Sequence, residues 1–222
     1  MTDSQKPDAP RRRGRRSSQD ISGREALIHA AIRAFAQRGY EGASLRMIAR
    51  EAEVDVALCA RLFGNKEQLW QAVIDHLAEN FESHYAQRLA ELETLSEHSA
   101  RQAIEGFIRL YADICMATPA FTAFLLQESN AHSERLEIIV EKLTRPLLLP
   151  AHRIVRKAQA AGVVAAREPE LFVRMLTSAL ALPMTTPTLL PAHTRSASNL
   201  EQRIVDEALS IFLLPESGNP PA

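Results

Sequence analysis

Two short helical segments separated by only three residues constrain the fold of this chain more than any other feature. Ser44 precedes the first segment and Asp55 precedes the second, which runs over residues 56–62. Serine and aspartate are preferred N-caps, because their side-chain oxygens accept hydrogen bonds from the first free backbone N–H groups. The connection, residues 53–55, is too short for the helices to separate. The sequence therefore predicts a tightly packed helix-turn-helix pair.

A preceding helix is expected to brace this pair. Ser22 and Glu25 have the spacing of a capping box, and apolar residues then recur at helical spacing until Gly39. Asn65 and Gln68 start a fourth, longer helix. In such an arrangement the first helix of the pair crosses the phosphate backbone, and the second enters the major groove of DNA. Helix pairs of this kind also occur in many all-helical cores, so spacing alone is weak evidence.

The rest of the chain also has a helical pattern. Eight glycines, 5% aromatic residues and 46% hydrophobic residues favour an all-α globular protein over a β-sandwich or barrel. We expect helices near residues 99–117, from 118, and over 133–145, 147–161, 169–181 and 198–214. Residues 183–197 are expected to form a loop. The predicted domains are a helix-turn-helix domain over 21–69, with its motif at 43–62, and a helical domain over 70–214.

Basic charge is concentrated at the N-terminus. Residues 1–70 carry 13 basic and 9 acidic side chains, whereas residues 71–222 carry 13 and 18. A disordered arm is expected over residues 1–20 and a disordered tail over 215–222. The arm contains five arginines that can follow the DNA backbone or enter the minor groove: Arg11, Arg12, Arg13, Arg15 and Arg16. A solubilising tail or a targeting patch is the alternative interpretation.

Several classes of function are disfavoured. Cys59 and Cys115 provide neither a disulfide framework nor a zinc-ligand set, and the seven histidines are scattered. The sequence has no nucleophile elbow, phosphate loop, HExxH motif or dinucleotide fingerprint, so we expect no catalysis, no cofactor and no metal. No apolar stretch reaches the roughly 18 residues that a membrane span requires, and no secretory leader is evident. A cytoplasmic protein is the expectation.

Three stretches carry a more specific signal: Ala30-Ala31-Ile32-Arg33-Ala34-Phe35-Ala36-Gln37-Arg38-Gly39-Tyr40, Ser44-Leu45-Arg46-Met47-Ile48-Ala49 and Phe63-Gly64-Asn65-Lys66-Glu67-Gln68-Leu69. Their order and spacing resemble the N-terminal domain of the tetracycline-repressor (TetR) family over about residues 24–73. The resemblance implies a transcriptional regulator, more often a repressor, that binds a pseudo-palindromic operator as a homodimer. It also implies release from DNA by a small, mostly apolar effector.

The resemblance assigns DNA contacts by position. Ser44 and Arg46 would meet phosphates, and Lys66 would pair with another phosphate. Four residues would lie on the groove side of the second helix: Val56, Ala57, Ala60 and Arg61. Arg61 is the candidate to read a guanine edge. For each charged residue, the alternative is a solvated surface position.

This sequence departs from the family pattern in the same segment. Glu53 stands where the family usually has glycine, and Asp55 replaces the usual Ser or Thr. Leu58, Cys59 and Ala60 stand where Thr, Leu and Tyr are common. A left-handed conformation at Glu53 would cost about 1 kcal/mol, and Cys59 is expected to be a core residue rather than a redox switch. The alternative function is therefore a dimeric ligand- or protein-binding module with a degenerate helix-turn-helix.

Effector-binding residues are expected on helix faces of the second domain. The apolar candidates are Phe107, Phe121, Phe124, Leu125, Phe172 and Met175, and the polar candidates are Tyr111, Gln127, Glu128 and His132. Plain core packing is the alternative for each apolar residue. Glu128 and His132 are four residues apart and can instead pair with each other.

A dimer interface is expected on the two helices that carry the broadest apolar faces. The candidate interface residues are Leu176, Ala179, Leu180, Leu200, Ile204, Ala208, Ile211 and Phe212. A thick core within one chain is the alternative explanation of these broad apolar faces.

Overall fold

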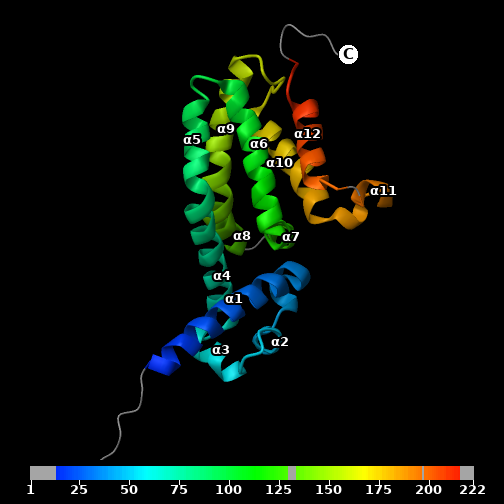
Figure 1. Cartoon of the computed structure of the whole chain (residues 1–222). Coiled ribbons are helices and arrows are strands. Elements are labelled where there is room, and N and C mark those ends of the chain that lie inside the picture. The colour runs from blue at the N-terminus through cyan, green and yellow to red at the C-terminus, as the bar shows by residue number, and fades with distance from the viewer. Residues whose placement is uncertain (1–13, 130–133, 197, 216–222) are drawn as a thin grey trace, which may run out of the picture.

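A computed structural model describes residues 14–129, 134–196 and 198–215 of the chain. All of its regular elements within these ranges are helical, as the sequence predicted. The N-terminal part contains α1 (Gly14–Gly42), α2 (Leu45–Glu51) and α3 (Val56–Phe63), which form a small three-helix unit at one end of the molecule (Figure 1). The remaining helices form a longer bundle above it.

The helix α1 begins earlier than expected. It starts at Gly14, so residues 14–20, assigned above to a disordered arm, are helical. Ser22 and Glu25 consequently lie inside the helix and do not begin it. Arginine, serine and glutamine are compatible with a helix, and extending a helix that is already formed adds a backbone hydrogen bond for each residue fixed. The helical conformation is interrupted at Gly39, whose φ is 68°.

One long helix leads from the N-terminal unit into the bundle. It comprises α4 (Lys66–Phe81), a π-helical turn η1 (Glu82–Ala86) and α5 (Gln87–Leu95), with helical backbone angles at each junction. Its start was predicted correctly, because the Asn65 side chain accepts a hydrogen bond from the Gln68 backbone N–H at 2.8 Å. The domain boundary expected between residues 69 and 70 therefore falls inside a continuous helix.

A second long helix runs beside the first. After α6 (Ala100–Ala117) and α7 (Pro119–Ser129), the chain forms α8 (Glu134–Ile139), the π-helical turn η2 (Val140–Thr144) and α9 (Arg145–Ala160) without a break. The expectation of two separate helices was wrong here. Pro146 cannot donate a backbone hydrogen bond, and its ring would crowd the carbonyl four residues earlier. The wider π-helical turn directly before it accommodates this residue without ending the helix.

The last helices also extend beyond the sequence prediction. The helix α10 (Pro169–Thr185) continues through Pro183, and the expected loop contains η3 (Pro187–Leu189) and α11 (Ala192–Arg195). Side-chain hydroxyls of Thr185 and Thr186 donate to the carbonyls of Ala181 and Leu182 at 2.7 and 2.6 Å and complete the final turn. The final helix, α12 (Leu200–Phe212), ends close to the predicted position.

The buried apolar residues form two clusters. The first lies within the bundle and includes Leu89 of α5 and Leu148 of α9. The second fills the N-terminal unit, but it also contains Trp70 of α4 and Leu143 of η2. Each long helix therefore passes from one cluster to the other near its π-helical turn. Within the described residues, no helix is both long and apolar enough to cross a membrane.

Candidate functional site

The connection between α2 and α3 has the geometry of a tight helix-turn-helix. The Ser44 hydroxyl oxygen accepts from the Met47 backbone N–H at 3.3 Å, and the Asp55 carboxylate accepts from Ala57 at 2.7 Å. Both predicted caps are confirmed. Glu53 has φ of 56°, a left-handed conformation that glycine adopts more easily. The chain thus keeps the turn while placing an exposed carboxylate in it.

The exposed face of α3 contains the predicted groove residues. Val56, Ala57, Ala60 and Arg61 are all exposed on it. On the opposite face, Cys59 and Phe63 are buried in the core of the N-terminal unit. Burial raises the pKa of the Cys59 thiol, which disfavours the reactive thiolate. The face therefore offers one guanidinium and three small apolar side chains to a partner.

The first helix of the pair presents two arginines. Arg46 and Arg50 are both exposed on α2, one helical turn apart. Arg50 was missed in the sequence, although its spacing of four residues from Arg46 was visible. The Ser44 hydroxyl accepts from the backbone and retains its own proton for donation. The start of α2 therefore offers a hydroxyl and a guanidinium to a backbone phosphate, and Arg50 adds a second guanidinium in its last turn.

Lys66 is more engaged than the sequence suggested. Its ammonium group donates to the backbone carbonyls of Tyr40 at 3.0 Å and Ala43 at 3.3 Å. It also lies 4.2 Å from the centroid of the Tyr40 ring. These contacts fix the end of α1 against α4, and a phosphate contact of Lys66 stays a prediction. Among the arm residues, Arg11, Arg12 and Arg13 lie outside the described residues, and Arg15 and Arg16 are described only as part of α1.

Most predicted effector residues are placed in other surroundings. Phe124 is 1% exposed and belongs to the core of the N-terminal unit, with its ring 6.4 Å from Phe35 and 6.2 Å from Trp70. Leu125 packs against the same core. Helical spacing alone did not indicate that α1 would cover this face of α7.

Other candidates are part of the bundle core or its surface. Phe107 is fully buried, and burial raises the pKa of Tyr111 beside it. Phe172 contacts Phe212 edge to face, with ring centroids 5.5 Å apart, and Met175 is exposed. Core packing, the alternative interpretation, describes Phe107 and Tyr111 better than a ligand site does.

The polar candidates have a structural role where they are described. Glu128 is 2% exposed and pairs with Arg135 at 3.3 Å. Arg135 of α8 is therefore a partner of Glu128, and the pairing with His132 that sequence spacing suggested stays a prediction. His132 and the side chain of Gln127 lie outside the described residues.

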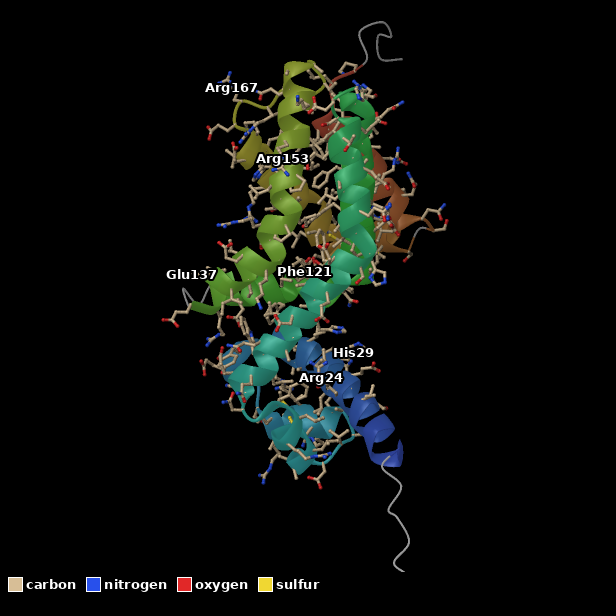
Figure 2. All side chains as sticks on the ribbon, turned by 90° about the vertical axis from the view of Figure 1, so that its left-hand side faces the viewer. Arg24, His29, Phe121, Glu137, Arg153 and Arg167 are labelled. Carbon is tan, nitrogen blue, oxygen red and sulfur yellow. The ribbon has the colours of Figure 1, made fainter. Side chains whose placement is uncertain are left out.

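A cavity of about 330 Å³ lies where the two hydrophobic clusters meet. Phe121 lines it and is the one predicted effector residue that does so among those described. Figure 2 shows Phe121 at the level between the N-terminal unit and the bundle. The full lining is Leu77, Asn80, Phe81, His84, Tyr85, Ile114, Ala117, Thr118, Phe121, Leu143 and Leu147.

Sequence reasoning missed the α4–η1 wall of this cavity. Asn80, His84 and Tyr85 face it from the first π-helical turn or the residues before that turn. The opposite wall includes Leu143 from the second π-helical turn. The only available signal was the excess of aromatic and polar residues over 80–85. Volume and lining are those of a small-molecule site.

The predicted dimer residues divide into two groups. Leu176, Leu180 and Ala208 are buried in the core of their own chain and leave almost no side-chain surface for a second copy. Ala179 and Ile211 are exposed, and Leu200, Ile204 and Phe212 are half-buried. Exposed apolar residues that the prediction did not include are Leu171, Met175 and Leu182 of α10. The exposed apolar surface of α10 and α12 thus consists partly of other residues than those predicted.

Comparisons with known proteins agree with this geometry. Residues 27–73 match the family model described as bacterial regulatory proteins, tetR family. The HTH-type transcriptional repressor Rv3405c of Mycobacterium tuberculosis is 46% identical over 52 residues, which cover 23% of this chain and 28% of that protein. The HTH-type transcriptional repressor NicS of Pseudomonas putida is 25% identical over 122 residues, 55% of each chain.

The whole fold also has solved counterparts. The hemolysin II transcriptional regulator HlyIIR superposes with a TM-score of 0.64 and 23% identity, over 85% of this chain and 97% of that one. At this level of identity the likeness concerns the fold. The sequence match with the family is concentrated in the helix-turn-helix unit, whose caps, turn and exposed face were described above. On this evidence the chain carries the N-terminal domain of the TetR family of bacterial regulatory proteins.

Proposed function

We propose that this protein is a transcriptional repressor that binds a pseudo-palindromic operator as a homodimer and leaves it when a small, mostly apolar effector occupies the cavity. The observation that carries the proposal is the exposed face of α3, which follows a capped three-residue turn and is flanked by Arg46 and Arg50. A helix presented in this way fits the major groove. The names of Rv3405c and NicS favour repression over activation.

The cavity supports the effector part of the proposal. It lies between the cluster that holds the helix-turn-helix and the cluster of the bundle. A ligand there contacts both, so its binding free energy can favour one relative placement of the two domains. Leu77 of α4 joins the cavity to the helix that supports α3.

The homodimer rests on the apolar surface of α10 and α12. Leu171, Met175 and Ile211 are each more than half exposed, a feature that an isolated globular domain rarely repeats on neighbouring helices. A second copy that covers this surface would place two α3 helices on one DNA duplex, with half-sites about one helical turn apart. Because DNA is the partner, the cytoplasm is the proposed site of action.

Binding to DNA tests the proposal directly. We would titrate the purified protein into labelled DNA from the region upstream of its own gene, and into a scrambled duplex, at about 50 and about 200 mM salt. Tight binding that prefers the upstream DNA supports a sequence-specific regulator. Equal, weak binding to both duplexes, lost at the higher salt, would leave the degenerate helix-turn-helix module as the better account.

A further inference from the structure

The cavity is lined without formal charge. Among the described residues that line it, none is Lys, Arg, Asp or Glu. Three of the residues that line it are aromatic: Phe81, Tyr85 and Phe121. A carboxylate or phosphate in these surroundings would lose its hydration without gaining an opposite charge. An uncharged ligand with a flat apolar body is the chemical class that fits.

His84 presents an acceptor to the cavity. Its Nδ1 atom lies 2.9 Å from the backbone carbonyl oxygen of Asn80. A carbonyl oxygen can only accept, so Nδ1 must carry the proton in this hydrogen bond. In the neutral ring, the remaining nitrogen, Nε2, then has a lone pair and no proton. The Nε2 atom of His84 is therefore an acceptor.

Asn80 presents its side-chain carbonyl to the cavity, because its side-chain amide nitrogen is engaged elsewhere. Its Nδ2 atom lies 3.4 Å from Nε2 of His76. Burial and the neighbouring His29 lower the pKa of His76, which favours the neutral ring and leaves Nε2 able to accept. With its amide nitrogen directed to His76, Asn80 has Oδ1 as the oxygen available to a ligand.

Thr118 completes the pattern from the opposite helix. Its hydroxyl donates to the Ile114 carbonyl at 3.1 Å, so its proton is engaged and its oxygen lone pairs are not. Three of the four polar residues of the lining thus offer acceptors. Tyr85 is the fourth, and its hydroxyl can both donate and accept.

We propose that the cavity selects an uncharged, largely aromatic molecule that carries an N–H or O–H donor, and that it rejects the carboxylate and donor-free analogues of that molecule. The biological meaning of this selectivity rests on the proposed effector role of the cavity, but the selectivity itself does not. A bound ligand without a donor covers these acceptors and shields them from water without satisfying them, and a carboxylate directs its own lone pairs at them.

Matched probes test the selectivity by calorimetry at about pH 8, where imidazoles are neutral. Indole is compared with 1-methylindole, and 2-naphthol with naphthalene and 2-naphthoate. We expect the donor-bearing member of each pair to bind at least about fivefold more tightly than its donor-free analogue, and 2-naphthoate to bind most weakly. Equal affinities within both pairs, tighter binding of 2-naphthoate or absence of any binding would overturn the proposal.

Variants locate the binding and identify the acceptors. Ala117→Trp fills the cavity from its exposed lining position and should abolish binding of every probe, whereas Ala160→Trp, at an exposed position of α9 outside the lining, should not. Because indole has a single N–H, whichever of Thr118→Val and His84→Phe removes the acceptor of that N–H should weaken indole about fivefold and leave naphthalene unchanged. Loss of both probes by the same factor, or binding that survives Ala117→Trp, would contradict the assignment.

The outcome is separable from that of the proposed function. If donor-bearing probes bind selectively but do not release the protein from DNA, the proposed ligand class is supported and the proposed effector role is contradicted. If probes with and without donors release the DNA equally well, the proposed effector role is supported and the proposed ligand class is contradicted.

Discussion

The guanidinium carbon of Arg135 in α8 lies 3.8 Å from the centroid of the Tyr40 ring, near the end of α1. The same guanidinium group pairs with buried Glu128 of α7 at 3.3 Å and with Glu41 of α1 at 3.7 Å. Lys66 lies 4.2 Å from the same ring centroid. A single tyrosine near the end of α1 thus holds cations from α4 and from α8, and it connects the helix-turn-helix unit to the bundle.

Removal of Arg135 should destabilise the protein far more than removal of an exposed ion-pair partner. Arg135→Met leaves the Glu128 carboxylate buried without its partner, and we expect a loss of about 3 kcal/mol in unfolding free energy. Arg145→Met breaks the exposed pair with Glu141, at 2.6 Å, and should cost about 0.5 kcal/mol or less. Urea unfolding of both variants measures the difference, and similar losses would contradict the structural role of Arg135.

Replacement of Glu53 by glycine should stabilise the chain. The φ of 56° at Glu53 is unfavourable for a residue with a side chain, so Glu53→Gly should add up to about 1 kcal/mol. Glu25→Gly is the matched control, because Glu25 is exposed within the regular helix α1 and its replacement should cost about 1 kcal/mol. Opposite signs in chemical denaturation are the expected result; a loss at both positions is not compatible with a strained turn.

Acid should destabilise the contact between α1 and α4. Burial and then His29 lower the pKa of His76 below its ordinary 6.5, so the folded state binds fewer protons at this ring than the unfolded state. Its contribution to stability is therefore present above about pH 6.5 and is lost as the pH falls from there. His76→Gln should reduce the drop in thermal midpoint between about pH 8 and 5.5.

The control for this measurement is His98→Gln at an exposed position. It should leave the acid-induced drop in thermal midpoint unchanged. His152, whose pKa burial also lowers, accounts for part of the drop that remains in His76→Gln. If the thermal midpoint falls by the same amount in the wild type and in His76→Gln, the His29–His76 contact does not cause the acid sensitivity.

The two arginines of the helix-turn-helix should affect DNA binding in different ways. Arg46→Ala should weaken binding to all sequences alike and reduce the salt slope by about 1, as expected for one phosphate contact. Arg61→Ala should cost about 1–3 kcal/mol on the preferred sequence and relax selectivity at one base pair. Anisotropy titrations against base-substituted duplexes at two salt concentrations separate the two effects.

Deletion of one residue should be tolerated in the π-helical turn but not in the helix that follows. Removal of exposed Ser83 converts η1 into an ordinary α-helical turn and keeps the flanking helices in phase. Removal of Glu91 from α5 instead rotates everything on one side by about 100° and moves Leu89 relative to its neighbours. Thermal unfolding should show a folded protein for the first deletion and a severe loss for the second.

Local signals predicted much of this fold. Ser44, Asp55 and Asn65 mark three helix starts correctly, because capping depends on residues only two or three positions apart. The residues on the exposed face of α3 came instead from the resemblance to the TetR family. The effect of two prolines was predicted wrongly: Pro146 and Pro183 lie within helices, and a π-helical turn precedes Pro146.

The effector site was less predictable for a physical reason. Helical periodicity identifies the buried face of a helix but not the neighbour that covers it. Phe124 was predicted to contact an effector, yet its ring packs against those of Phe35 and Trp70, which lie far from it in the sequence. The cavity depends on where two cores meet, which no local pattern encodes; Phe121 was the one predicted residue found there among those described.

The passage of both long helices between the two clusters limits how this protein can be divided. Phe124, Ile139 and Leu143 complete the core around Trp70, although all three lie beyond the segment that matches the family model. A fragment ending after α4 would expose one side of that core to water. The smallest DNA-binding unit that can fold on its own is therefore not one continuous segment of the chain. A chimaera that exchanges only the family-matched segment would lack the matching residues of α7, α8 and η2 that pack on its core. We expect such an exchange to give a folded protein only when the α7–η2 segment is exchanged with it.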